Sequence, residues 1–244
     1  MFRLHELKRR QICRIAFVAM CIAPTTCAVA WGVSRRLSGH AEAYAAELSQ
    51  VTGLRASVSS IAHPRPWATL VRDLSLTDAE TGKALAQVRT LEVDFSDNEA
   101  LLRASQVEID AAGAASLWAP IDCQLRRGRD QPTCALRLIA GEATWHGTTA
   151  QTFNDIDARI ASTDEGRQAE ISFRPVGSEV EKPVVLRVMR RVQDGEATTH
   201  VMLETSGSPL SCALFVPWLS GIEHLGERAT FVGSMEMNLT NDGW

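Results

Sequence analysis

The histidines are the residues of this chain best suited to bind metal or transfer protons, and they are scattered along it. Their positions are His5, His40, His63, His146, His200 and His224. None stands with a second histidine or a carboxylate in a metalloprotease motif, which needs both on one helix face. His200, between Thr199 and Val201 in a predicted strand, is expected to be an ordinary surface or hydrogen-bonded histidine. The sequence therefore predicts no metal site.

Nucleophile and phosphate-binding motifs are also missing from the sequence. There is no G-x-S-x-G elbow, P-loop or G-x-G-x-x-G stretch, and Ser206-Gly207-Ser208 is interpreted as a loop. Asp155 and Asp157 could place two carboxylates on one strand face, because alternate residues of a strand point the same way. We expect that face to be solvated rather than catalytic. The sequence therefore predicts a non-enzymatic protein without a cofactor.

The six cysteines divide evenly between two parts of the chain. Cys13, Cys21 and Cys27 belong to the apolar N-terminal region, where cysteine acts as a small apolar residue. The other three are Cys123, Cys134 and Cys212. Cys123 and Cys134 flank residues 127–130 almost symmetrically and could form a cross-strand disulfide if this segment is a hairpin. The alternative, which we favour, is two unpaired and partly buried thiols.

Charge excludes one class of partner. The formal net charge is −4, and much of the Lys and Arg lies near the N-terminus, so a nucleic-acid partner is not expected. Arg187, Arg190 and Arg191, with Lys182 nearby, make one later strand basic. These side chains could meet anionic lipid headgroups, although a solvated charged face is the favoured interpretation.

The stretch 15–33 is uncharged and is bounded by Arg14 and by Arg35-Arg36. As a helix it would reach about 28 Å, close to the hydrocarbon thickness of a bilayer. Residues 1–14 are basic, and the positive-inside rule keeps such a segment in the cytoplasm. We therefore expect residues 1–14 to be a cytoplasmic head, 15–33 a transmembrane helix, and the remainder to be extracytoplasmic.

Two other interpretations of residues 15–33 are open. Ala28-Val29-Ala30 fits the cleavage site of a secretory signal, with the cut after Ala30, but the apolar run is longer than the usual signal core. A buried core helix is the third alternative. Because helical pattern continues beyond the cleavage site, a retained anchor is favoured.

Residues 34–53 follow as an amphipathic helix, with apolar positions spaced along one helical face before Gly53. From residue 54 the apolar period changes to two. Short strands are expected around 54–58, 70–76, 91–95, 107–109, 136–138, 156–160, 171–173 and 229–240, with a hairpin over 182–205 that turns at Asp194-Gly195. Helices are predicted at 114–127 and 209–225, the second short or bent because of Pro217.

This pattern predicts an N-terminal transmembrane helix followed by a mainly-β (α+β) domain over 54–244, built on a curved, mostly antiparallel sheet with a few helices. The last four residues, Asn241 to Trp244, carry turn chemistry after a strand. Either that strand is an edge with a frayed end, or the chain is the N-terminal portion of a longer protein; the second is favoured.

The order of these segments resembles a known family. A basic head, one span and a helix ending in Thr52-Gly53-Leu54 are followed by the strands LRASVSSI and TLVRDLSLTD, the turn AETGKALA and the strand VRTLEVDF. This order resembles the start of AsmA-like envelope proteins, whose sheet folds into a long β-groove. The resemblance is firmest over residues 15–95 and carries no catalytic residues.

The resemblance implies a membrane protein of the bacterial cell envelope, anchored in the inner membrane with its bulk in the periplasm, that handles or transports lipid or helps assemble the outer envelope. Its partners would be the membrane, lipid and other envelope proteins. The residues expected to face lipid are Leu70, Leu74, Leu91, Val93 and Phe95. The alternatives are an anchored structural or protein-interaction module whose β-rich core is closed by its own helices, and an anchored enzyme, which no motif supports.

Overall fold

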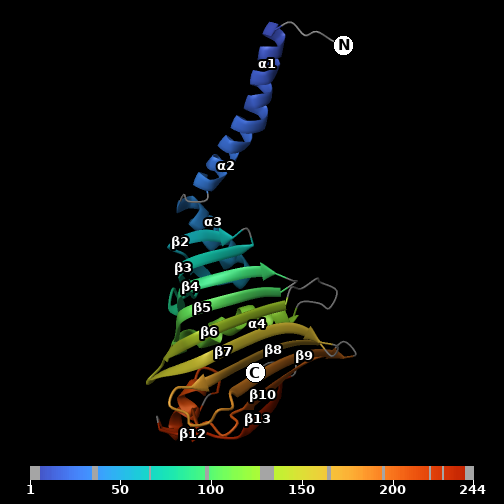
Figure 1. Cartoon of the computed structure of the whole chain (residues 1–244). Coiled ribbons are helices and arrows are strands. Elements are labelled where there is room, and N and C mark those ends of the chain that lie inside the picture. Colours follow the sequence, from blue (N-terminus) through green and yellow to red (C-terminus); the bar gives the residue numbers. More distant parts are fainter. Residues whose placement is uncertain are drawn as a thin grey trace.

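A long apolar helix projects from the N-terminal end of the protein in the computed structural model (Figure 1). The structure describes residues 6–34, 38–65, 67–96, 99–126, 135–163, 166–193, 196–219, 221–226 and 228–239. The helix comprises α1 (Glu6–Phe17), a π-helical turn (Val18–Ile22) and α2 (Ala23–Ser34). The π turn lies just before Pro24, whose missing N–H interrupts the regular hydrogen-bond ladder.

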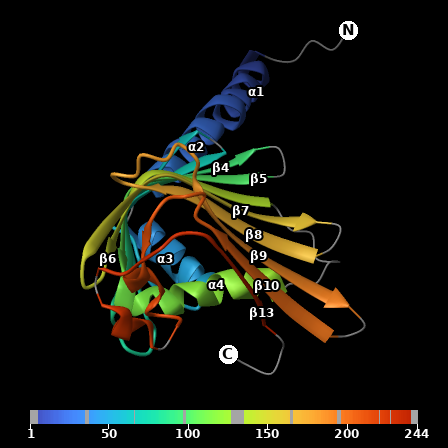
Figure 2. The same ribbon diagram turned by 90° about the horizontal axis from the view of Figure 1, so that it is seen from below.

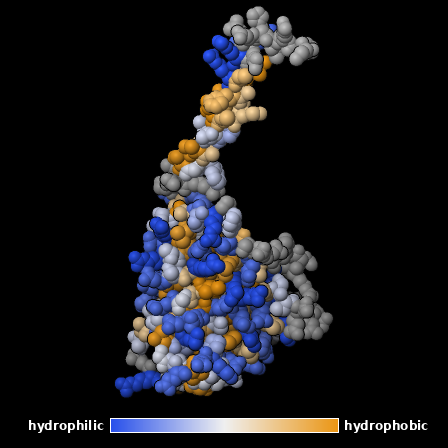
Figure 3. Space-filling model, viewed as in Figure 1, coloured by the Kyte–Doolittle hydropathy of each residue, from blue (hydrophilic) through white to orange (hydrophobic). Residues whose placement is uncertain are grey.

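The segment Arg10–Val33 of this helix is long and apolar enough to cross a membrane, and none of its apolar window is buried inside the protein. That exposure contradicts the alternative of a buried core helix. It agrees with either a membrane span or a signal sequence. Figure 3 shows the contrast in composition, with hydrophobic residues along the helix and mostly hydrophilic residues on the visible face of the domain below it.

The domain is built on an 11-stranded sheet, which confirms the predicted α+β class with a mostly antiparallel sheet. The strand order is β1-β3-β4-β5-β6-β7-β8-β9-β10-β13, with β2 also paired to β3. The strands are β1 (Arg55–Ser57), β2 (Ser60–Arg65), β3 (Ala68–Thr77), β4 (Ala84–Ser96), β5 (Glu99–Asp110), β6 (Ala135–His146), β7 (Ala150–Thr163), β8 (Gly166–Pro175), β9 (Val184–Gln193), β10 (Glu196–Glu204) and β13 (Ser234–Leu239).

Two helices lie on the concave side of this sheet (Figure 2). The first is α3 (Ser38–Thr52), which the sequence placed at 34–53. The second is α4 (Ala114–Arg126), which agrees with the helix predicted over 114–127. Helix α4 lies in the connection between β5 and β6, the parallel pair of the sheet, and a parallel pair needs such a crossover.

A row of left-handed residues crosses the strands β3 to β7. Asp73, Gln106 and Asp155 have φ of 50°, 50° and 53°. In the strand register Asp73 lies opposite Arg89, Arg89 opposite Gln106, and Asp155 opposite Gly141. The Arg89 guanidinium donates to Gln106 Oε1 at 3.0 Å. Such residues bend a strand locally and shift its side-chain alternation, as β-bulges do.

The shift in alternation is visible on both sides of the row. In β4 the buried apolar residues are Leu91 and Val93 on one side of the row and Leu85 and Ala86 on the other, so that an even position also turns inward. In β6, Ala140 is buried on one side of the row and Ala143 on the other. A single period of two therefore cannot describe these long strands.

The outer face of the sheet carries ion pairs between neighbouring strands. Arg137 pairs with Asp157 and Arg187 with Glu170, both at 2.6 Å. These side chains are more than a third exposed, so each pair contributes little to stability. These ion pairs keep the outer face of the sheet polar and hydrated, while the concave face packs on the helices.

The C-terminal segment differs from the sequence prediction. Instead of a helix over 209–225, the structure has β11 (Leu210–Ser211) and two 3-10 helices, Cys212–Phe215 and Ile222–Leu225. The strand β12 (Thr230–Phe231) pairs with β11. Pro217 and the left-handed Gly221 prevent one continuous helix. Three of the predictions concern residues outside those that the structure describes. These are the hairpin turn at Asp194-Gly195, Cys134 and residues 241–244.

The turn between β3 and β4 is tied to α4 by the carboxylate of Asp78. This carboxylate accepts hydrogen bonds from the backbone and hydroxyl of Thr81, at 2.7 and 2.9 Å, and from the hydroxyl of Ser116 at 3.0 Å. Hydrogen bonds from Thr81 and then Ser116 favour the charged form and lower the pKa of Asp78 to about 2. The anionic carboxylate is therefore the form that the folded state prefers.

Acid should remove this contribution. Because the folded-state pKa of Asp78 lies below its unfolded value, its stabilising effect is complete above pH of about 4 and disappears as the pH falls towards about 2. We expect Asp78→Ala to be less stable than the parent protein at neutral pH, with the difference shrinking in this window. Urea unfolding of both proteins across pH measures it. A difference that is constant with pH would contradict the assignment.

Candidate functional site

The candidate site is the concave face of the sheet, where apolar side chains gather over most of the strands. Under α3, the buried cluster is Ala56, Val71, Leu74, Leu91, Val93, Ala104 and Ala140. Tyr44 and Leu48 of α3 pack against it. Burial, with Glu47 adding to it, raises the pKa of the Tyr44 phenol. This first cluster lies at the end of the sheet next to the N-terminal apolar helix (Figure 1).

Two further clusters continue the apolar face away from the N-terminal apolar helix. Under α4, Leu125 packs with Ala169 and Val188, and Trp118 and Ile121 of the same helix border them. Beside β11 and β12 the third cluster is Val184, Leu203, Leu210 and Leu214, edged by Trp145, Phe153, Phe173, Leu186, Phe215, Phe231 and Met235. The apolar face thus extends from β1 to β13.

The five residues predicted to face lipid do not share one environment. Leu74, Leu91 and Val93 are 6%, 8% and 6% exposed and belong to the cluster under α3. Leu70 pairs with Glu92, while its neighbour Val71 pairs with Leu91. Since paired residues share a face, Leu70 lies on the outer side. Phe95 is 61% exposed at the end of β4.

Phe95 has an aromatic neighbour that the sequence analysis missed. Trp67 immediately precedes β3, is 54% exposed, and its carbonyl accepts the Phe95 amide at 3.1 Å. The pair continues the inward positions of β3 and β4, so both side chains lie at the rim of the concave face. The signal was present in the sequence as a tryptophan after Pro64-Arg65-Pro66, but a turn there gave no reason to assign it a face.

The two carboxylates that the sequence analysis considered for catalysis, Asp155 and Asp157, each form an ion pair with an arginine. Asp155 pairs with Arg174 at 2.6 Å. Asp157 accepts two hydrogen bonds from Arg137, which lower the pKa of its carboxyl. An ionised carboxylate held by arginine is a poor general base, because its charge is already stabilised. The alternative of a paired-carboxylate site therefore gains no support.

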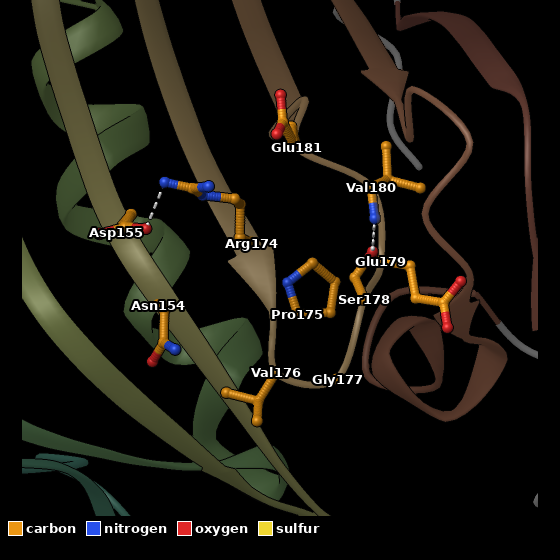
Figure 4. A pocket seen from close by; sticks show the side chains of 10 residues that line it. All are labelled: Asn154, Asp155, Arg174, Pro175, Val176, Gly177, Ser178, Glu179, Val180 and Glu181. Atoms are coloured by element: carbon orange, nitrogen blue, oxygen red, sulfur yellow. Dashed lines mark hydrogen bonds and ion pairs between the residues drawn. The ribbon is translucent and has the colours of Figure 1, made fainter.

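A shallow hollow of about 240 Å³ lies beside the ion pair of Asp155 with Arg174 (Figure 4). It is bordered by Asn154, Asp155, Arg174 and the turn Pro175–Glu181, in which Ser178 Oγ accepts the Val180 amide at 3.3 Å. The side chains in Figure 4 line an open surface and do not converge on one point. This arrangement offers no catalytic or cofactor-binding geometry.

The histidines that the structure describes do not gather with other ligands into a metal site. His40 and His63 meet at 3.1 Å between their Nε2 atoms, and His63 Nδ1 lies 3.2 Å from Thr69 Oγ1. His200 Nδ1 lies 2.8 Å from Asn238 Oδ1. Within the part of the chain that the structure describes, no three His, Cys, Asp or Glu side chains gather as metal ligands do.

The remaining predicted residues are placed as follows. Arg187 pairs with Glu170 on the outer face, in agreement with a solvated charged surface. Cys123 lies on α4, so the segment before residue 127 is a helix and not one strand of a hairpin. Its thiol is exposed and not partly buried, which corrects that part of the prediction. Because Cys134 lies outside the described residues, the choice between a disulfide and two thiols stays a prediction.

The chain was compared with known protein families, with curated proteins and with solved structures. It matches none of them.

Proposed function

We propose that this chain is a membrane-anchored, non-enzymatic protein of the bacterial cell envelope whose curved sheet handles lipid, in transport or in outer-envelope assembly, as AsmA-like proteins do. Its N-terminal helix would be retained in the inner membrane, with residues 1–14 in the cytoplasm and the sheet in the periplasm. The observation that carries the proposal is the apolar concave face that begins beside the membrane helix and extends to β13.

The aromatic rim of this face supports the proposal. Trp67 and Phe95 are large, exposed and adjacent, whereas exposed aromatics scattered singly would need no explanation. An acyl chain gains about 0.8 kcal/mol for each methylene removed from water, so a short apolar rim can hold part of a lipid. The ion-paired outer face would remain in water while the rim contacts the lipid.

The alternative is an anchored structural or protein-interaction module. The specific observation in its favour is that α3 and α4 already cover much of the concave face, as Figure 2 shows. On this view the clusters are an ordinary core. In the first function lipid contacts the rim at Phe95, and in the second it does not. Phe95 is therefore the residue at which the two functions can be distinguished.

Site-specific photocrosslinking at Phe95 should therefore capture lipid. The full chain, carrying a photoreactive phenylalanine at position 95 and expressed in bacterial membranes, is expected to yield lipid adducts in mass spectra. Leu70 is the matched control, because it lies on the neighbouring strand β3 but on the outer face. We expect several-fold less lipid adduct from position 70. Equal labelling of both positions, or protein adducts alone at position 95, would favour the interaction module.

A further inference from the structure

Two histidines from separate elements meet at the end of the sheet next to the N-terminal apolar helix (Figure 1). His40 lies in the first turn of α3, and His63 lies in β2, a strand that α3 contacts. Their Nε2 atoms are 3.1 Å apart, and both side chains are half-buried. Because the two histidines are 23 positions apart in the sequence, no local motif indicated this pair.

The two imidazole rings face each other head-on. Their centroids are 5.4 Å apart, and this distance exceeds the 3.1 Å between the nitrogens by the radii of the two rings. Each Nε2 atom therefore lies close to the line that joins the centroids. The lone pair of an unprotonated ring nitrogen points outward from the ring along that line. The Nε2 lone pairs of His40 and His63 are thus directed at one point between the rings.

Thr69 orients the His63 ring at its other nitrogen. The hydroxyl oxygen Oγ1 of Thr69 lies 3.2 Å from His63 Nδ1. When Nδ1–H donates to this hydroxyl, Nε2 carries no proton and presents its lone pair to His40. A histidine that ligates a metal characteristically donates its second N–H to an oxygen in this way. The pair therefore has an orienting partner in addition to its facing nitrogens.

The number and direction of the ligands select the ion. Zn²⁺ takes four ligands at tetrahedral angles, and within the described part of the chain no three His, Cys, Asp or Glu side chains gather. Two nitrogens in line suit Cu⁺, a closed-shell ion that two ligands can hold in a linear arrangement, and imidazole is a copper ligand. Metal–nitrogen bonds of about 2 Å place the nitrogens about 4 Å apart, so the rings must separate by about 1 Å. Small rotations of the two side chains supply this movement.

We propose that His40 and His63 bind a Cu⁺ ion between their Nε2 atoms, in place of the hydrogen bond that otherwise joins the two rings. The ion would connect α3 directly to β2 and so fix the helix on this end of the sheet. The two ligands come together only in the folded chain, so Cu⁺ should stabilise the protein against unfolding. This inference does not depend on lipid handling.

The test is an anaerobic titration of the full chain in detergent with Cu⁺, in competition with the chromophoric chelator bicinchoninate. Exposed thiols are first alkylated with N-ethylmaleimide, because thiolates compete for Cu⁺. We expect one equivalent to bind, with X-ray absorption showing two nitrogen ligands in a linear arrangement. His63→Ala should weaken binding at least tenfold. His200→Ala is the matched control, because His200 contacts Asn238 elsewhere, and it should bind within twofold of the parent.

Two substitutions of His40 distinguish a metal ligand from a hydrogen-bonding residue. Gln can still donate a hydrogen bond to His63 but is a poor copper ligand, so His40→Gln should keep the stability of the metal-free chain and lose Cu⁺ binding. Met cannot donate a hydrogen bond, but its thioether binds Cu⁺, so His40→Met should keep affinity within about tenfold of the parent. Thr69→Val keeps both ligands and should weaken binding about 10- to 100-fold, because the His63 ring loses its orienting partner.

Urea unfolding with and without Cu⁺ supplies a second measurement. Cu⁺ should raise the urea midpoint of the parent and of His40→Met, but not that of His40→Gln. An equal increase in His40→Gln would place the copper elsewhere and overturn the proposal. Affinity that neither His40→Gln nor His63→Ala lowers would show that the two rings are only hydrogen-bonded. Zn²⁺ that binds the pair as tightly as Cu⁺ would contradict the linear site.

Discussion

Val71→Asp is expected to unfold the domain, whereas Leu70→Asp, one residue earlier on the same strand, should be tolerated. Val71 is fully buried at the centre of the cluster under α3. A carboxylate there would have no partner and should cost more than about 4 kcal/mol of unfolding free energy. Leu70 lies on the outer face, where a carboxylate remains hydrated and the loss should be about 1 kcal/mol.

Urea unfolding of the full chain in detergent, followed by tryptophan fluorescence, measures both losses. Val71→Ala is the matched control, because it removes volume without adding charge and should fall between them. Similar losses for Val71→Asp and Leu70→Asp would show that the two residues do not occupy opposite faces.

This comparison also shows where the sequence prediction of the sheet was limited. The prediction that Leu70 and Leu74 both face lipid placed them on one face of β3, because a regular strand keeps a period of two. Asp73 adopts a left-handed conformation, so the inward residues are Val71 before it and Leu74 after it. An aspartate within an apolar run does not by itself indicate a positive φ, since aspartate also occurs in regular strands. The sequence therefore predicted the correct face of the sheet for Leu91 and Val93, which lie on one side of the row of left-handed residues. It predicted the wrong face for Leu70.

The helices illustrate a second limit. The helix at 38–52 and the helix at 114–126 were predictable, because each has its own apolar stripe. The apolar residues between 210 and 222 have the same spacing, yet they form 3-10 turns around Pro217 and Gly221. Pairing partners were harder still. The parallel contact of β5 with β6 depends on the whole sheet, and no local pattern encodes it.

Gly166→Ala is expected to be the most damaging small substitution in the sheet. Gly166 begins β8 with φ of 154°, and a Cβ built on it would lie 2.1 Å from the carbonyl oxygen of Arg190 in β9. The obstacle is backbone of a paired strand, so it cannot move aside as a flexible side chain would. Relief of the clash requires β8 to separate locally from β9, which carries the cluster under α4. We expect a loss of at least about 3 kcal/mol of unfolding free energy.

Gly82→Ala separates this steric effect from backbone strain alone. Gly82 also has positive φ, of 67°, but a Cβ there would meet nothing within 4 Å. Its replacement should therefore cost only about 1 kcal/mol, the usual price of a left-handed alanine. Hydrogen exchange adds a spatial readout, because the amides of β8 and β9 should lose protection in Gly166→Ala and keep it in Gly82→Ala. Equal destabilisation by the two variants would mean that β8 and β9 do not approach so closely, and the continuity of the concave face from the cluster under α3 to β13 would then fail at this strand pair.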